Sequence, residues 1–246
     1  MSGSRLERRK KKKASARSTV FRYLAIALIV AGVGVLGYVG LEWFTVYYRQ
    51  ARLQQEYDAS AGFGRLVEED QEVVLTEWEP MRLIIPAIDV HLTVLADVDV
   101  YDKDELGNEP WNFGSSDYHH WINSLKPLLD EAPVYYQLSD LPSTESGNVV
   151  IAGHRAGRWN FFLDLDLLEP GDEIYLDISG YRFIYHVDHL AEVGKYDWTM
   201  FYTTEDPSIT LQTCTPKHMP NPPLRLNARG VLYDVEPLPL ETPYVN

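Results

Sequence analysis

Apolar and polar residues are distributed differently in three parts of the chain. Residues 23–41 (YLAIALIVAGVGVLGYVGL) contain no charge, and a helix needs about 20 such residues to cross a bilayer. From residue 81 onward, short runs of branched and aromatic residues are interrupted by Gly, Pro and Asp. This second pattern is typical of β-strands. Residues 45–80 start with a helical pattern, then contain Ser and Gly, and are interpreted as a stalk between the two.

The strand pattern predicts one folded domain over residues 81–237. Residues 81–95 (MRLIIPAIDVHLTVL) predict two strands joined by a turn near Pro86. Further strands are expected at 147–154, 173–178, 181–193, 208–214 and 224–237. A brief helix is expected at 161–168. Many short strands with few helices favour an all-β barrel or sandwich over a parallel sheet.

One segment, residues 97–132, does not follow the strand pattern. It is rich in acids, contains Trp111 and Trp121, and has an amphipathic pattern around 118–130 that predicts a helix. Loops of this length are usually functional or disordered. We therefore interpret the segment as an insertion beside the functional site. The last residues, 238–246, form a short polar tail.

Charge is concentrated at the N-terminus. The chain has 22 basic and 36 acidic residues, and residues 1–22 hold nine of the basic ones and one acid, which leaves 13 basic and 35 acidic residues in the remainder. Such an acidic domain argues against nucleic acid as a partner, because phosphate binding needs clustered Lys and Arg.

The basic cluster also predicts the orientation of the apolar run. Positively charged flanks stay on the cytoplasmic side, so residues 1–22 would be a cytoplasmic tail. Residues 23–44 would be a single-pass anchor in the cell membrane, ending in the interfacial aromatics Trp43 and Phe44. Everything from about residue 45 onward would then be extracytoplasmic. A cleaved signal peptide is the alternative, but the run is long for one and no small-x-small site follows it.

The chain has one cysteine, Cys214, which excludes an intramolecular disulfide and a multi-cysteine zinc site. It closes a predicted strand beside Pro216, where a thiol would be accessible. A cysteine nucleophile acts as the thiolate, which a nearby base or positive charge favours. His154 also follows a strand, and Gly153 before it allows a close backbone approach. An antiparallel neighbour would bring Arg225 beside the thiol, where a guanidinium can stabilise an oxyanion.

Four motifs together resemble one family. TLQTC (210–214) resembles the T-L-x-T-C signature of sortases, which attach surface proteins to bacterial cell walls or to one another. SGNVVIAGHR (146–155) resembles the strand that carries the family's histidine, and LRLNARG (224–230) the strand that carries its arginine. RLIIPAI (82–88) is similar to the family's opening pattern. The motifs occur in family order over most of residues 81–236.

The resemblance implies a sortase-type eight-stranded β-barrel with short helices, preceded by one transmembrane helix. It also implies a cysteine transpeptidase, of the cysteine peptidase class of hydrolases. Cys214 would attack a peptide bond in an LPxTG-like C-terminal sorting signal. His154 would protonate the leaving amine and then deprotonate an amine nucleophile of peptidoglycan or a pilin. Arg225 aligns with the family's arginine.

Three further residues receive supporting roles. The resemblance places Thr213 where the family helps to hold the oxyanion, and Arg229 is the reserve for Arg225. His218, four residues past the cysteine, is expected to shape specificity.

EPW (109–111) resembles the lid of pilus-assembling sortases but follows the first strands instead of preceding them, so the subclass stays open. A hydrolase that resolves its acyl-enzyme with water and an inactive peptide-binding module remain alternatives.

No metal site and no cofactor are predicted. His186 and His189 are three apart in a predicted strand and would face opposite sides of it. Calcium is the one ion with a candidate segment, since acidic residues cluster at 97–105, but the Gly spacing of a calcium loop is missing. A solvated acidic loop is the favoured interpretation.

Overall fold

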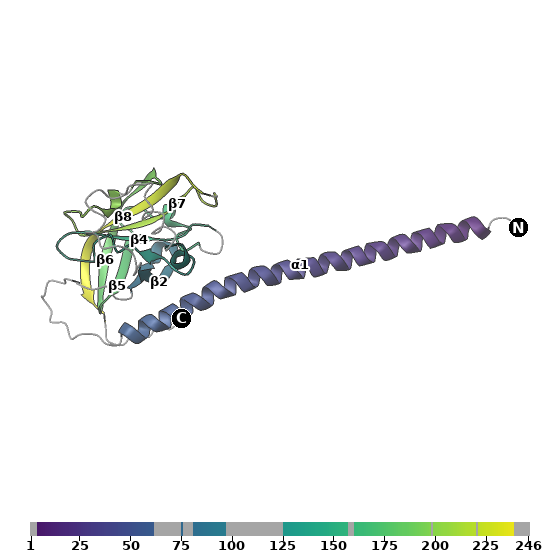
Figure 1. The fold of residues 1–246 in the computed structure, drawn as a ribbon, viewed down its shortest axis with the longest axis horizontal. Helices are drawn as coiled ribbons and strands as arrows, with labels where there is room; N and C mark the ends of the chain where they lie inside the picture. Colours follow the sequence, from purple (N-terminus) through teal and green to yellow (C-terminus); the bar gives the residue numbers. More distant parts are fainter. Residues whose placement is uncertain are drawn as a thin grey trace. The chain divides into compact units, whose positions relative to one another are not determined.

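A long helix and a β-barrel make up the described part of the chain (Figure 1). The computed structural model describes residues 4–61, 75, 81–96, 125–156, 160–197, 199–219 and 221–238. The chain divides into two units, Met1–Tyr47 and Tyr48–Asn246. The second unit therefore includes the last helical turns of the predicted stalk as well as the strands.

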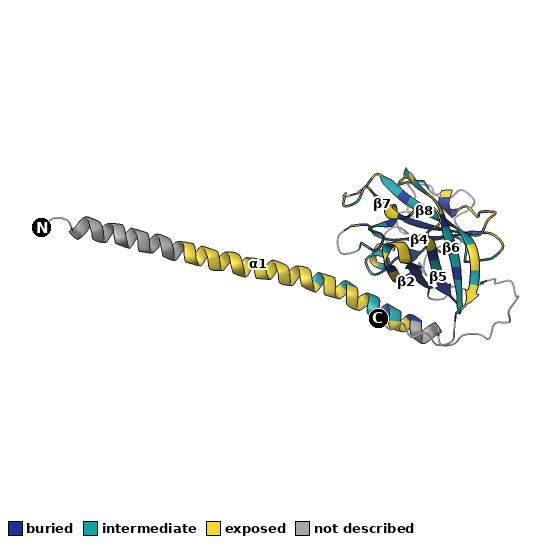
Figure 2. Ribbon diagram, turned by 180° about the vertical axis from the view of Figure 1, so that it is seen from behind, coloured by how far each residue is buried: buried dark blue, intermediate teal, exposed yellow. Residues whose placement is uncertain are grey.

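Helix α1 runs without interruption over Ser4–Ala61. Every residue from Phe21 to Leu41 is exposed, including its large apolar side chains (Figure 2). By length and composition, the part of the helix within Phe21–Tyr57 can cross a membrane. An apolar surface of this extent needs a lipid or protein environment to cover it.

The strands close into a single barrel, which confirms the predicted fold class. Their order around the barrel is β1-β2-β3-β4-β7-β8-β6-β5. The strands are β1 (Met81–Ile85), β2 (Val90–Ala96), β3 (Val134–Tyr135), β4 (Asn148–Ala152), β5 (Glu173–Ile178), β6 (Tyr181–Gly194), β7 (Ser208–Thr215) and β8 (Leu224–Pro237). Three short 3₁₀ helices accompany them: η1 (Pro86–Ile88), η2 (Leu165–Leu167) and η3 (Thr199–Phe201). Most neighbours are antiparallel, but β2 with β3 and β4 with β7 are parallel.

The local pattern predicts the long strands well and the short elements poorly. β5 has the predicted bounds 173–178, and β6, β7 and β8 differ from expectation by no more than one residue. The brief helix expected at 161–168 is only the 3₁₀ turn η2. β3 was not predicted, because two residues are too few to show a strand period. Of the insertion, 97–124 lie outside the described residues, and 125–129 are helical.

Buried apolar side chains make up most of the core, and a buried charge cluster lies on the β1–β5–β6 side of the barrel. Strands β1 and β4 are buried at every position. Asp177 on β5 is fully buried and accepts hydrogen bonds from Arg82 (Nη2 to Oδ2, 2.7 Å) and Arg182 (Nε to Oδ1, 2.7 Å). The guanidinium of Arg82 also lies 4.9 Å from the ring centroid of Tyr57 on α1. We call Asp177, Arg82 and Arg182 the Asp177 cluster.

Candidate functional site

The parallel pair β4 and β7 brings His154 and Cys214 to the same edge of the barrel. Ala152 pairs with Gln212, and the N–H of Gly153 donates to the carbonyl of Gln212 at 3.0 Å. Parallel strands run in the same direction, so the residues that follow Ala152 stay level with those that follow Gln212. His154 therefore lies at the level of Cys214 on the neighbouring strand, although the two are 60 residues apart in sequence.

Close packing fixes the end of β4. A Cβ on Gly153 would lie 2.7 Å from the ring of Phe162, which is fully buried, so glycine is required there. The N–H of Phe162 in turn donates to the carbonyl of His154 at 3.0 Å. The buried hydroxyl of Thr213 donates to the carbonyl of Gly153 at 2.7 Å. These contacts hold the backbone of His154 against both the 160–164 segment and β7.

Cys214 and Arg225 are direct cross-strand partners. β7 and β8 are antiparallel, with Cys214 opposite Arg225 in the register. Side chains at directly opposite positions project from the same face of the sheet, about 5 Å apart at Cβ. Cys214 is a free thiol and the one residue of β7 that is not buried. The strand register therefore places Arg225 beside the thiol, as the sequence predicted.

The guanidinium of Arg225 is held by backbone carbonyls. Its Nη1 donates to the carbonyls of Pro222 (3.2 Å) and Leu224 (3.0 Å). These bonds restrict the side chain to the start of β8, next to Cys214. A fixed positive charge at this place can attract a thiolate and stabilise negative charge that develops on a neighbouring carbonyl oxygen.

Asp130 contacts His154, and sequence reasoning missed it. The distance between Nε2 of His154 and Oδ1 of Asp130 is 3.3 Å. Burial lowers the pKa of His154 below its usual value, whereas the hydrogen bond and charge of Asp130 act to raise it, and the charge of Lys126 acts to lower it. Asp130 belongs to no recognisable motif and precedes His154 by 24 residues, so no local signal marks it.

The sequence comparison with protein families decides the identity of the barrel. The model of the sortase domain matches residues 83–232, which is more than half of the chain and contains His154, Cys214 and Arg225. The chain belongs to the sortase family. Membership implies a cysteine transpeptidase, in agreement with the thiol, imidazole and guanidinium found at one barrel edge. No curated protein sequence matches this sortase.

Solved sortase structures are similar to this chain at low sequence identity. A lid mutant of sortase C1 from Streptococcus agalactiae is 22% identical, with 77% of this chain and 89% of the other covered and a TM-score of 0.47. Sortase C-3 from Streptococcus pneumoniae is 22% identical, with 79% and 86% covered and a TM-score of 0.49. Sortase E1 from Streptomyces coelicolor, with a tripeptide in its active site, is 21% identical, with 64% and 90% covered and a TM-score of 0.47.

An ionic network ties three segments of this sortase together beside Cys214. Arg155 is buried, and its Nη1 lies 3.5 Å from the carbonyl of Cys214 while its Nε donates to the carbonyl of Leu163 at 3.1 Å. Its Nη2 pairs with Asp166 at 2.6 Å, and Lys217, after β7, pairs with the same carboxylate at 2.8 Å. We call Asp166, Arg155 and Lys217 the Asp166 cluster. It connects the residue after His154 with the backbone of the cysteine.

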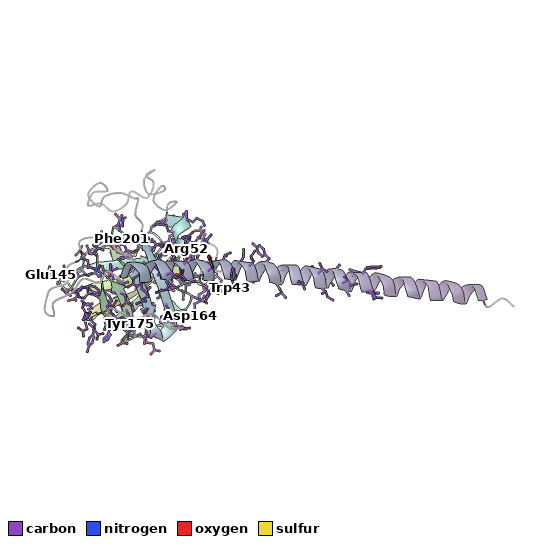
Figure 3. The ribbon with its side chains drawn as sticks, turned by 90° about the horizontal axis from the view of Figure 1, so that it is seen from below. Trp43, Arg52, Glu145, Asp164, Tyr175 and Phe201 are labelled. Atoms are coloured by element: carbon purple, nitrogen blue, oxygen red, sulfur yellow. The ribbon has the colours of Figure 1, made fainter. Side chains whose placement is uncertain are left out.

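Asp164 also belongs to this network, and the network lowers the pKa of Asp166 at its centre. Lys217 also pairs with Asp164, labelled in Figure 3, at 3.2 Å. Partial burial would raise the pKa of Asp166, but hydrogen bonds from Lys217 and Arg155 outweigh it and lower the pKa below its usual value. Both cationic side chains therefore face an ionised carboxylate at neutral pH.

The other predicted residues of this sortase occupy different positions. Arg229 lies opposite Thr210 on β7, four positions from Arg225, and pairs with Asp188 at 3.0 Å. At about 3.3 Å per residue, that is roughly 13 Å along the strand from the Cys214 level. His218 lies in the loop after β7, is exposed, and has a left-handed backbone (φ 60°).

Metal ligands do not cluster in the described part of this sortase. Within the ranges given above, no group of three or more His, Cys, Asp or Glu side chains could hold a metal ion. His186 instead stacks on Tyr233 with ring centroids 4.2 Å apart, and His189 contacts Asp188. The acidic stretch 97–105, the candidate segment for calcium, lies outside the described residues.

Proposed function

We propose that this protein is a membrane-anchored transpeptidase that joins a sorting-signal peptide to an amine through an acyl-enzyme on Cys214. The pairing of Cys214 with Arg225 across β7 and β8, with His154 at the adjacent end of β4, carries this proposal. Nucleophile, proton carrier and charge stabiliser come from three strands of one rigid barrel. Rigid elements hold reacting groups more precisely than loops do.

The reaction would proceed in two balanced steps. The thiolate of Cys214 attacks the carbonyl carbon of the scissile peptide bond, and Arg225 stabilises the resulting oxyanion. The C–N bond then breaks as His154 gives its proton to the leaving amine, which leaves a thioester. An incoming amine attacks the thioester, its proton passes to His154, and the thiolate is released. Thr213 supports both steps by fixing Gly153, and so the backbone before His154, against β7.

The substrates we propose follow from membership of the family. The acyl donor is a surface protein with an LPxTG-like C-terminal signal, and the acceptor is an amine of peptidoglycan or of a pilin. His218 is exposed in the loop after β7 and is available to contact the donor peptide. No metal or other cofactor is required for the two steps.

The apolar part of α1 would hold the enzyme in the cell membrane with its N-terminus in the cytoplasm. Residues 1–22 carry the positive charge that favours this orientation, and the exposed apolar surface of Phe21 to Leu41 would lie in lipid. Protease treatment of intact cells tests the topology. We expect the barrel to be digested and an N-terminal epitope tag to be protected. Release of the barrel into the medium would indicate a cleaved signal peptide instead.

The activity is tested on the full chain in detergent micelles with a library of sorting-signal peptides. Mass spectrometry follows the products with and without an added glycine-type amine, for wild type and for Cys214→Ala. A product that carries the added amine, and that Cys214→Ala does not form, is expected. Cleavage that yields only the free acid would indicate a hydrolase. An unreactive thiol together with peptide binding would indicate a binding module and refute the proposed chemistry.

A further inference from the structure

A carboxylate from outside the four sortase motifs lies against the imidazole of the site. Oδ1 of Asp130 is 3.3 Å from Nε2 of His154, and the two side chains are 25% and 31% exposed. An ionised carboxylate only accepts hydrogen bonds, so Nε2 of His154 is the donor. This bond assigns a proton to Nε2 and directs the proton exchange of the reaction to the other ring nitrogen, Nδ1.

The main chain around Asp130 is anchored, so the carboxylate is presented by an ordered turn. Residues 125–129 are helical, and the N–H of Asp130 donates to the carbonyl of Lys126 at 3.1 Å. Leu125 is buried in an apolar cluster that also contains Val150 and Ala152 of β4, the strand that leads to His154. Asp130 and His154 are thus attached to the same packed unit.

The last turns of α1 support this turn from the other side. Nε2 of Gln50 donates to the carbonyl of Glu131 at 2.8 Å, and Arg49 pairs with the carboxylate of Glu131 at 3.5 Å. Gln54 contacts Thr93 on β2 at 3.4 Å, and Leu53 is buried. The juxtamembrane helix therefore contributes to placing the residue next to Asp130.

We propose that Asp130 is a positioning residue, whose carboxylate holds the imidazole of His154 by its Nε2–H so that Nδ1 faces the reacting groups. This role rests on the proposed function of His154 as the proton carrier. When His154 takes a proton from the incoming amine, Asp130 stabilises the imidazolium that forms. The proton stays on the ring.

Other charged groups lie near the imidazole, and of these Lys126 acts on its pKa. Lys126 pairs with Asp130 at 3.3 Å and opposes its effect on His154. Cys214 of β7 and Arg225 of β8 lie at the same barrel edge, and Arg155 of the Asp166 cluster follows His154 directly in the chain. Of these groups, Asp130 and Lys126 can be changed without altering Cys214 or Arg225.

The deciding experiment compares Asp130→Asn with Glu131→Gln in the full chain in micelles. Both remove one carboxylate from the same turn, but only the first removes the contact to His154. We expect Asp130→Asn to lower kcat about tenfold to a hundredfold with KM nearly unchanged. That is less than the roughly 10⁴-fold effect of a buried triad aspartate, because Asp130 is partly exposed. Asp130→Glu should restore part of the activity, and Glu131→Gln should keep it.

A titration that needs no turnover distinguishes this role from a structural one. NMR of ¹³C-labelled histidine, assigned with His154→Gln, should show the pKa of His154 lowered in Asp130→Asn and raised in Lys126→Gln. An unchanged titration in Asp130→Asn, or an equal loss of kcat in Glu131→Gln, would overturn the role of Asp130. If wild type transfers no acyl group to an amine, the proposed function fails, and the titration still reports the contact by itself.

Discussion

Two carboxylates in this sortase each hold two cationic side chains, but they differ in burial. Asp177 is fully buried between Arg82 and Arg182, whereas the side chain of Asp166 is 41% exposed beside Arg155 and Lys217. The Asp177 cluster lies on β1, β5 and β6, and its Arg182 is opposite Glu236 on β8, eleven positions along that strand from Arg225. The Asp166 cluster joins the segment after His154 to the backbone of Cys214. Ion pairs of similar composition thus support the fold at one place and the site at the other.

Burial explains why the two clusters should respond differently to mutation. A charge removed from a buried group leaves its partners without compensation in a medium of low dielectric constant. An exposed ion pair exchanges its partners for water and contributes little to stability. The Asp166 cluster combines both cases, since its carboxylate is exposed while Arg155 is buried.

The largest effect on stability is expected for Asp177→Asn. This change leaves Arg82 and Arg182 next to a neutral amide and should destabilise the fold by about 3–5 kcal/mol. Urea unfolding of the full chain in micelles, followed by near-UV circular dichroism, measures the loss. The kcat of the molecules that remain folded should not change. A loss below about 1 kcal/mol would show that water reaches the two guanidinium groups.

Arg155→Lys is expected to have an intermediate effect on stability and a clear effect on activity. A lysine keeps the charge, but its single ammonium group cannot contact the carboxylate of Asp166 and the carbonyls of Leu163 and Cys214 at the same time. Buried carbonyls that lose their donor should cost about 1–3 kcal/mol, and kcat should fall because the Cys214 backbone is no longer fixed. Unfolding curves and peptide-transfer kinetics are measured on the same preparation. Unchanged kcat would show that the network serves the fold alone.

Asp166→Asn makes the same chemical change as Asp177→Asn in the exposed cluster. We expect a smaller loss of stability than for Asp177→Asn, because the carboxylate itself is exposed, although buried Arg155 loses its ion partner. The part of the loss that comes from exposed charges should disappear at 1 M salt because such charges are screened. Unfolding at low and high salt tests this expectation. A loss equal to that of Asp177→Asn would contradict burial as the cause of the difference between the clusters.

The smallest effect concerns the pH dependence of stability through His154. Its folded pKa is lowered from 6.5 chiefly by burial, so the unfolded chain binds more protons between the two values. Stability linked to His154 is therefore present above pH 6.5 and is lost as the pH falls through the folded pKa. Between pH 8 and pH 5, the free energy of unfolding should decrease less with falling pH for His154→Gln than for wild type. Parallel curves would show that the imidazole is as solvated in the folded state as in the unfolded one.

The sequence alone determined the elements whose signal is local. Alternation of apolar and polar residues located β5 to β8, because neighbouring positions on a strand face opposite sides. The sequence also indicated a close approach to the backbone at Gly153, and the buried ring of Phe162 is the group that approaches it. The motif around Cys214 identified the thiol and the strand that presents it.

Only the tertiary structure decided which distant groups meet. β3 is two residues long and exists because β2 and β4 pair with it. Two residues are too few to show the apolar–polar alternation of a strand, so the sequence does not predict it. Asp130 reaches His154 through the packing of residues 125–129, and Arg155 reaches the Cys214 carbonyl because β4 and β7 run parallel. Such contacts depend on the path of the chain between the partners. A strand pattern specifies which face a side chain occupies, whereas barrel closure and register specify what it faces.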